Sequence, residues 1–508
     1  MSMPRALSAA CVLAMAAACA PGRPAAGPRP DGLPEVRREL RGVWVASVAN
    51  IDWPSRPGLP ADGQKAELVA MLDRAAALKL NAVVLQVRPA ADALYASDLE
   101  PWSEYLTGQM GRAPEPFYDP LEFAVAEAHR RGLELHAWFN PYRARHPSGH
   151  SPAAESHISR ARPELVRTYG RYLWMEPGEP AVRERTTAVI LDVVRRYDVD
   201  GVHIDDYFYP YPERDSAGAV VDFPDEPSWT RYVQGGGRLS RGDWRRKNVD
   251  DLVRDLYGRI KAEKPWVKFG ISPFGVWRPG SPPEATIAFD QYAALYADAR
   301  RWLREGWMDY FTPQLYWPIA RYDLSYPVLL DWWVGENVKG RHLWPGNFTS
   351  RTVEADPRPW PASEVLGQVY VTRGRPGATG NVHFSMRAFM LNPDSLVERL
   401  QRDAYRDPAL VPASPWLSRG APGRPSVTVE RGASGVTVDF APGGGPAPMW
   451  WVVRARFGDR WRVEVLPGGA RTHTVARGSE TADPTEVAVS AVDRVGIEGP
   501  ARVVPVPR

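Results

Sequence analysis

Eight short apolar runs alternate with helical patterns along most of the chain, and this alternation constrains the fold most strongly. The runs lie at 42–48, 82–87, 133–139, 201–205, 268–272, 310–316, 342–348 and 382–386. Several are almost continuously apolar, as expected of parallel strands that are covered on both faces. Amphipathic segments lie between or after them, at 65–79, 120–130, 182–197, 249–260, 291–304, 326–336, 363–372 and 394–404.

Eight strands, each followed by a helix, predict an α/β fold, a closed (β/α)8 TIM barrel, over residues 39–410. The alternative is an open doubly wound sheet. No G-x-G-x-x-G sequence follows the first strand, and the count of eight favours closure.

The pattern of alternating apolar runs and helical segments ends at about residue 410. The sequence PWLSRGAPGRP predicts a linker at 411–424. Short strands separated by Gly, Pro and Asp turns then predict a small all-β sandwich at 425–508. Its ending, VAVSAVDRVGIEGPA, resembles the last strands of a fibronectin type III module. We expect this domain to attach the protein to glycan or envelope, or to act as a spacer.

The first 22 residues are typical of an export signal. Arg5 precedes an apolar run at 6–18 that is too short to span a membrane. The run ends at Cys19 in the sequence Ala-Ala-Ala-Cys, which resembles a bacterial lipobox although Leu is more usual three positions before the Cys. Simple cleavage after an A-x-A site is the alternative. Both interpretations predict an exported protein, periplasmic or anchored to the outer membrane by a lipid on Cys19, with a Pro/Gly/Ala-rich tether at 23–38.

The charge and the cysteine content argue against nucleic-acid binding and against disulfide bonds in the folded body. The chain has 63 basic and 60 acidic residues and no run of five Lys or Arg, so nucleic-acid binding has no electrostatic support. Both cysteines, Cys11 and Cys19, lie in the N-terminal segment, so we expect no disulfide in the folded body. The 20 Trp and 20 Tyr could fill a core, but many fall at predicted strand ends, where they could stack on sugar rings.

The strongest chemical signal is the pair Asp205 and Asp206 at the end of the fourth predicted strand, in the sequence DGVHIDDY. Barrel active sites lie at the C-terminal ends of the strands. Strand alternation directs His203 and Asp205 into the barrel mouth. When two carboxyl groups are adjacent, the pKa of one is raised while the other stays ionised. Glycoside cleavage needs such a pair, because one group protonates the leaving oxygen and the other stabilises or attacks the anomeric carbon. We therefore expect Asp205 and Asp206 to be catalytic; the alternative is a structural pair beside Arg88 or Arg143.

Polar and aromatic side chains at the other strand ends are expected to bind the substrate. They are Asp52, Trp53, Arg88, Asp92, Trp138, Asn140, Tyr142, Arg143, His203, Tyr207, Tyr209, Trp277, Gln314, Tyr316, Trp317 and Asn347. The chain lacks the G-x-S-x-G, Walker A and H-E-x-x-H sequences. His136 and His203 do not form a complete metal-ligand set with neighbouring carboxylates, so we expect neither a metal nor another cofactor.

No second catalytic carboxylate follows predicted strands five to seven. The strand-four segment partly resembles the D-G-x-D-x-D-x-E strand of family 18 chitinases, but Tyr207 occupies the position of the acid. Asp52, Asp92 and Glu100 are candidates in loops. If the substrate carries 2-acetamido groups, its own amide could act as the nucleophile, and two neighbouring carboxylates would then suffice.

Seven segments together resemble the glycosyl-hydrolase-like family 10. They are LRGVWVASVANIDWPS, NAVVLQVRPAADALY, EPWSEYLTG, LELHAWFNPYR, DGVHIDDYFYPYP, GISPFGVWRP and DYFTPQLYW. The resemblance covers residues 39–410 and implies a (β/α)8 barrel, an envelope location and glycan cleavage. Some members of the family act on peptidoglycan. For such a member, the resemblance implies that the substrate is glycan strands without stem peptides and that the partners are cell-division proteins. A glycosidase for another polysaccharide and a non-catalytic glycan-binding protein remain open.

Overall fold

The computed structural model describes residues 32–286, 288–354, 358–418, 420–433, 435–477 and 482–507. The predicted signal peptide, Cys19 and most of the tether lie outside the described residues. A compact unit begins at Val36 and contains both the barrel and the C-terminal domain. No helix in these ranges has the length and apolar character needed to cross a membrane.

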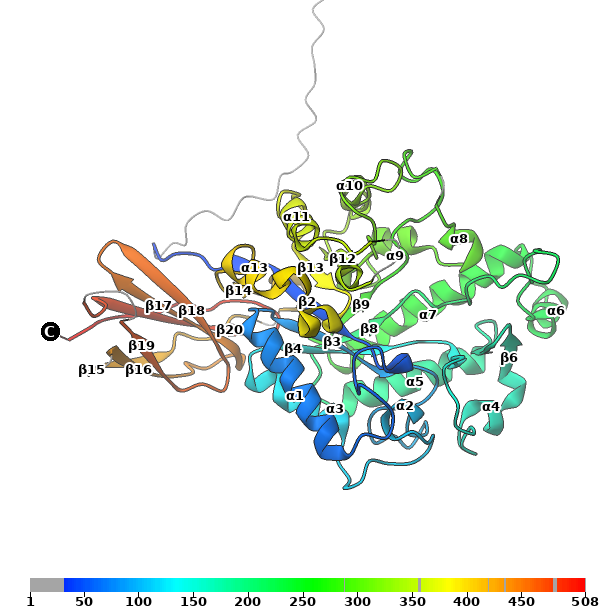
Figure 1. The fold of residues 1–508 in the computed structure, drawn as a ribbon, viewed down its shortest axis with the longest axis horizontal. Coiled ribbons are helices and arrows are strands. Elements are labelled where there is room, and N and C mark those ends of the chain that lie inside the picture. Colours follow the sequence, from blue (N-terminus) through cyan, green and yellow to red (C-terminus); the bar gives the residue numbers. More distant parts are fainter. Residues whose placement is uncertain are drawn as a thin grey trace, which may run out of the picture. The chain divides into compact units, whose positions relative to one another are not determined.

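A parallel sheet forms the centre of the compact unit (Figure 1). Its strands are β2 (Leu40–Val45), β3 (Ala82–Arg88), β4 (Glu134–Phe139), β8 (Gly201–Ile204), β9 (Lys268–Ile271), β10 (Tyr310–Phe311), β11 (His342–Leu343), β12 (Gly346–Asn347) and β13 (Gly380–His383). Their order is β11-β10-β9-β8-β4-β3-β2-β13-β12. Only Trp344 and Pro345 separate β11 from β12, so the two ends of the sheet belong to one segment and the sheet closes. Each predicted run contains a strand, which confirms the barrel.

Helices cover the outside of the barrel. They are α1 (Ala61–Ala77), α3 (Pro120–Arg130), α5 (Pro180–Arg196), α7 (Arg241–Glu263), α8 (Gln291–Ala294), α9 (Ala299–Glu305), α10 (Tyr326–Glu336), α11 (Ala362–Arg373), α12 (Met386–Leu391) and α13 (Leu396–Arg402). Capping explains several boundaries: Asp119 accepts hydrogen bonds from the backbone of Leu121 and Glu122 at the start of α3. The helix predicted at 291–304 is divided because Asp298 caps a new helix, α9.

Smaller elements surround the barrel mouth. The segment after β4 forms an antiparallel sheet of β5 (Arg143–Arg145), β7 (Tyr172–Met175) and β6 (Val166–Tyr169). Short helices lie in three of the strand-to-helix connections: α2 (Glu104–Thr107) after β3, α4 (Ile158–Ala161) after β4 and α6 (Glu226–Gln234) after β8. A pair of two-residue strands, β1 (Arg37–Arg38) and β14 (Ala409–Leu410), joins the two ends of the barrel sequence.

A hydrogen-bonded network occupies the barrel interior below the mouth. Lys268 Nζ lies 2.7 Å from Glu134 Oε1, and both side chains are fully buried. His136 joins Glu134 to the hydroxyl of Tyr310, at 2.9 and 2.8 Å. The same hydroxyl lies 3.1 Å from Nδ1 of His203. Because buried polar groups must be paired, this network fixes the position of His203 directly behind the strand ends.

The C-terminal domain is all-β, as predicted, and contains two antiparallel sheets. One sheet has the order β15 (Ser426–Gly432), β16 (Gly435–Ala441), β19 (Thr472–Ala476). The other has the order β18 (Arg460–Pro467), β17 (Pro448–Phe457), β20 (Glu486–Asp493), β21 (Arg502–Pro505). The strands β19 and β21 have weak sequence signals, because the first is largely polar and the second is short and ends in proline.

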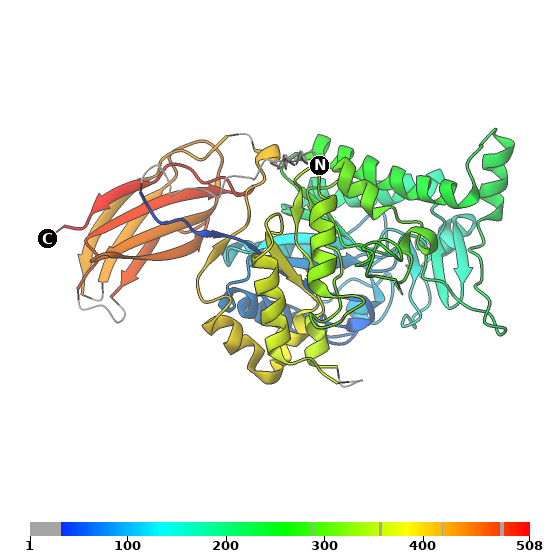
Figure 2. The same ribbon diagram turned by 90° about the horizontal axis from the view of Figure 1, so that it is seen from above.

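This domain packs against the N-terminal ends of the barrel strands (Figure 2). Trp450 donates its indole hydrogen to Gly132 O over 2.7 Å, and Lys268 Nζ donates to Arg494 O over 3.2 Å. The segment expected to be a linker is also packed: Val411 is buried, and Ser414 N donates to Val495 O over 2.8 Å. The domain therefore covers the floor of the barrel.

Candidate active site

A cavity of about 330 Å³ opens at the C-terminal ends of the barrel strands. Its lining residues are Trp44, Ala46, Val48, Ala49, Ile51, Gln86, Trp138, Arg143, His146, Asp205, Asp206, Tyr207, Tyr211, Ser272, Phe274, Gln314, Tyr316, Phe348 and Phe384. Both Asp205 and Asp206 lie on its wall, among many aromatic rings. This cavity is the candidate active site, and we call it the catalytic pocket for that reason.

Asp205 is held by donors from β4 and the residue that follows it. Trp138 Nε1 donates to Oδ2 over 3.1 Å, and Asn140 Nδ2 lies 3.2 Å from both carboxylate oxygens. Burial raises the pKa of Asp205 to about 7, and the neighbouring charge of Asp206 adds to the rise. Arg143 and the two hydrogen-bond donors oppose it without cancelling it. Asp205 is therefore a carboxyl group that is substantially protonated near neutral pH.

Asp206 has a different set of partners. The hydroxyl of Tyr211 donates to Asp206 Oδ2, and Gln314 provides a second side-chain hydrogen bond. Burial raises the pKa of Asp206, while these donors favour its ionised form. Two adjacent carboxyl groups with unlike partners are the arrangement in which one acts as an acid and the other stays charged.

The arginines that could have paired with these carboxylates have other contacts. Arg88 is fully buried, and its Nε donates to Glu100 Oε2 over 2.6 Å. Arg143 donates from Nε to Pro89 O over 2.9 Å, and its guanidinium lies 4.8 Å from the ring centroid of Tyr207. Arg88 thus serves the loop structure, whereas Arg143 remains on the pocket wall as a positive charge near both carboxylates.

The residues predicted to bind substrate fall into three groups. Trp138, Arg143, Tyr207, Gln314 and Tyr316 line the catalytic pocket.

Asn140 and His203 form the second group, one layer behind the pocket wall. Asn140 binds Asp205, as described above. His203 Nε2 lies 2.9 Å from Ser272 Oγ and 3.2 Å from the indole nitrogen of Trp44, and both of those residues line the pocket. Burial holds the pKa of His203 well below its usual value, so it is a neutral positioning group.

The third group does not line the pocket: Asp52, Trp53, Arg88, Asp92, Tyr142, Tyr209, Trp277, Trp317 and Asn347. Most of these side chains are buried and serve the structure around the mouth. Asp52 accepts hydrogen bonds from Ala46 N, Ser385 Oγ and the backbone of Arg387.

Other members of the third group also contact neighbouring protein groups and do not line the pocket. The indole of Trp53 donates to Gln64 O, and Trp277 stacks on Trp332. Asn347 donates to Gln368 Oε1 over 2.8 Å. Burial raises the pKa of Asp92 to about 6, but its place is in the buried loop and not in the pocket wall.

Several lining residues were not among those predicted, including Trp44, His146, Tyr211, Phe348 and Phe384. Trp44 lies inside a strand, and Tyr211 lies five residues beyond Asp206, so neither stands at a strand end. Phe348 and Phe384 follow β12 and β13 directly, and strand-end position was the signal that could have found them.

Gln86 also lines the pocket and has a fixed orientation. Its Oε1 accepts hydrogen bonds from Ser47 N and Val48 N, at 3.0 and 2.9 Å. Its Nε2 is buried and has no hydrogen-bond partner among the described residues. Since the two backbone donors fix the oxygen, the amide group offers a hydrogen-bond donor that a ligand can satisfy.

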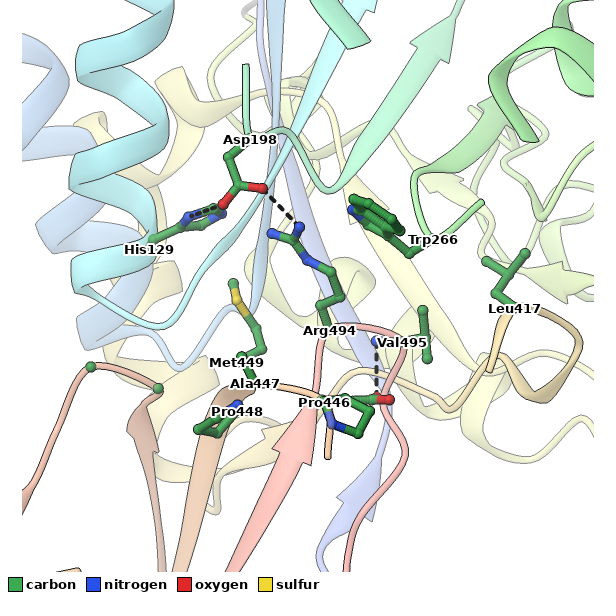
Figure 3. Close-up of a pocket in the computed structure, with 13 residues that line it drawn as sticks. His129, Asp198, Trp266, Leu417, Pro446, Ala447, Pro448, Met449, Arg494 and Val495 are labelled. Atoms are coloured by element: carbon green, nitrogen blue, oxygen red, sulfur yellow. Dashed lines mark hydrogen bonds and ion pairs between the residues drawn. The ribbon is translucent and has the colours of Figure 1, made fainter. Parts of the chain in front are cut away.

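A larger cavity of about 530 Å³ lies at the opposite end of the barrel, against the C-terminal domain. Figure 3 shows Asp198 between His129 and Arg494, with Met449 and Pro448 on the other wall. Arg494 Nη1 lies 2.7 Å from Asp198 Oδ1. This cavity is at the N-terminal ends of the strands, where barrels place structure and not chemistry, so the catalytic pocket is the better candidate.

The chain is similar to a family model and to individual known proteins. The family model for glycosyl hydrolase-like 10 matches residues 39–352. Glycosyl hydrolase YngK of Bacillus subtilis is 44% identical over 402 residues, which are 77% of this chain and 76% of that protein. Glycosyl hydrolase DigH of Escherichia coli K12 is 37% identical over 333 residues, 61% of this chain and 73% of that protein.

Among solved structures, the glycoside hydrolase domain of PgaB (BpsB) from Bordetella bronchiseptica aligns with a TM-score of 0.48 and 14% identity, over 72% of this chain and 98% of that one. The family match and the two relatives show that the chain belongs to the glycosyl hydrolase-like 10 family and is a glycosidase.

Proposed function

We propose that the protein cleaves glycosidic bonds in peptidoglycan glycan strands that lack stem peptides. The observation that carries this proposal is the pair of adjacent carboxyl groups in one aromatic-lined pocket, each with its own hydrogen-bond partners. Family membership supports glycoside cleavage, and the resemblance to peptidoglycan-acting members supports this substrate.

Asp205 is the proposed general acid. With a pKa of about 7 it carries a proton in a large fraction of molecules at neutral pH. It donates that proton to the glycosidic oxygen as the bond between that oxygen and the anomeric carbon breaks.

Asp206 is the proposed orienting carboxylate. Asp205 and Asp206 are the only carboxylic acids among the described residues that line the pocket. A 2-acetamido group on the substrate can replace a protein nucleophile: its carbonyl oxygen bonds to the anomeric carbon while Asp206 accepts its N–H. Water then opens the cyclic intermediate and returns a proton to Asp205. Peptidoglycan sugars carry this acetamido group.

The remaining sequence expectations extend the proposal. The export signal and Cys19 support an envelope location, periplasmic or outer-membrane-anchored, with cell-division envelope proteins as candidate partners. The C-terminal domain is proposed to be fibronectin type III-like. Its sheets of three and four strands, in the orders β15-β16-β19 and β18-β17-β20-β21, support that assignment.

The test is digestion of purified sacculi. Peptide-free and peptide-bearing sacculi are incubated with the purified protein, and the released fragments are analysed by mass spectrometry. Release of reducing fragments from peptide-free strands is the expected result. Fragments ending in 1,6-anhydro sugars would indicate lytic cleavage, and binding without release would indicate a non-catalytic protein. A trapped covalent glycosyl-enzyme would exclude the acetamido nucleophile.

A further inference from the structure

A third cavity, of about 430 Å³, lies beside the catalytic pocket and shares Ala49 with it. A chain of side-chain hydrogen bonds runs from the wall of one cavity to the wall of the other. His146, which lines the catalytic pocket, lies 2.7 Å from Ser148 Oγ, and that oxygen lies 2.9 Å from the hydroxyl of Tyr105. Ser148 and Tyr105 both line the third cavity, which we call the side cavity. A polymer with one sugar in the catalytic pocket can therefore place a neighbouring sugar in the side cavity.

The side cavity offers a positive charge without a protein partner. Arg56 lines it, is exposed, and makes neither a hydrogen bond nor an ion pair within the described part of the chain. Glu104 is the only acid among the described lining residues. Its Oε2 accepts hydrogen bonds from His150 N and Ser151 N, each at 2.7 Å, so its charge is already compensated. The cavity thus favours an anionic group on the bound sugar.

The loop that carries Arg56 is fixed on both sides. Asn50 Nδ2 donates to Pro54 O over 2.8 Å and to Tyr105 O over 2.9 Å. Ser55 N donates to Glu67 on α1 over 2.9 Å, and Gly58 N donates to Leu106 O over 3.2 Å. Because the backbone is held in place, only the arginine side chain must become ordered when a ligand binds.

We propose that Arg56 binds the carboxylate of a muramic acid residue that lies next to the cleaved bond. This inference rests on the proposed function. The lactyl group of muramic acid ends in a free carboxylate only after the stem peptide has been removed; with the peptide attached, the same carbon is part of a neutral amide. A guanidinium binds a carboxylate through two charge-assisted hydrogen bonds, which an amide cannot reproduce. Arg56 would therefore select strands that lack stem peptides.

The experiment compares two substrates that differ only in this group. Peptide-free strands are used as they are, or after their carboxyl groups have been converted to primary amides with carbodiimide and ammonia. We expect amidation to lower kcat/KM of the wild-type protein by about 10-fold. Arg56→Gln should show the lower value on both substrates, and Arg56→Lys should be intermediate. Arg406→Gln is the matched control: the side chain of Arg406 is 72% exposed and lines neither cavity, so this variant should match the wild type.

Two results would overturn the inference and leave the proposed function standing. One is a wild-type protein that cleaves native and amidated strands equally well. The other is an Arg56→Gln variant that keeps the full wild-type preference for the native strands. A wild-type protein that releases nothing from peptide-free strands would instead contradict the proposed function itself.

Discussion

Trp138 donates its indole hydrogen to Asp205 Oδ2 over 3.1 Å while its ring forms part of the wall of the catalytic pocket. This contact links two proposed roles, because one side chain both shapes the proposed sugar-binding surface and influences the proton affinity of the proposed acid. Hydrogen bonding to the ionised carboxylate lowers the pKa of Asp205, in opposition to burial, which raises it to about 7.

Trp138→Phe should therefore move the pH profile. An acid with a pKa of about 7 is protonated below that pH and loses its proton above it, so wild-type kcat should fall as the pH rises through about 7. Removing the indole donor raises the pKa of Asp205 further, and the alkaline limb of the kcat profile should shift to higher pH. The measurement is kcat against pH for both proteins. An unchanged or acid-shifted limb would show that Asp205 is not the group that titrates.

Gln86→Glu should weaken substrate binding without unfolding the protein. The new carboxylate can still accept the hydrogens of Ser47 N and Val48 N, but its second oxygen replaces the amide donor that has no described protein partner. We expect kcat/KM to fall by roughly 10- to 100-fold, as for the loss of a hydrogen bond in a buried site. Since a third carboxylate shifts the pH profile, each protein is compared at its own optimum. Full activity there would mean that the amide does not contact substrate.

Lys268→Met should destabilise the barrel. The change leaves Glu134 buried without its ammonium partner at 2.7 Å, which costs about 3–5 kcal/mol for a buried pair. Equilibrium denaturation measures the loss. The double variant Glu134→Gln with Lys268→Met removes both charges and should recover part of the stability. A double variant no more stable than Lys268→Met alone would argue against the ion pair as the cause.

Trp450→Ala tests whether the C-terminal domain is part of the barrel's stability. Trp450 is buried against Gly132 in one apolar cluster with barrel residues such as Leu40 and Ala82. Loss of a buried tryptophan should cost about 3–5 kcal/mol, and the barrel and sandwich should unfold together. Two separate thermal transitions, with the barrel transition unchanged, would show that the domain is only a spacer.

The barrel could be predicted from the sequence because each strand is a short apolar run and each helix has its own hydrophobic period and capping residues. These are local signals. The arrangement of the side chains at the barrel mouth was harder to predict. Arg143 and Tyr142 are neighbours in the same strand-end segment, but only Arg143 reaches the pocket, while Tyr142 packs in the core. Composition cannot separate two such residues; the direction of each side chain does.

Long-range folding explains the other omissions. Tyr211 reaches Asp206 because the loop after β8 turns back over the mouth, and no local pattern announces that turn. Trp53 shows the opposite error: an aromatic residue after the first strand looked like a sugar platform, but its indole donates to Gln64 O inside the core. Strand-end position therefore indicated the region of the pocket, and tertiary packing determines which residues line it.

The most direct test of the account is the activity of Asp205→Asn on peptide-free glycan strands. The amide keeps the size of the side chain but cannot donate a proton as an acid, so kcat should fall by about 10²–10⁴-fold, while the thermal unfolding temperature stays close to that of the wild type. Asp62→Asn, at the exposed start of α1, serves as the control and should retain full activity. An Asp205→Asn protein that is folded and cleaves the strands at the wild-type rate would contradict the central claim.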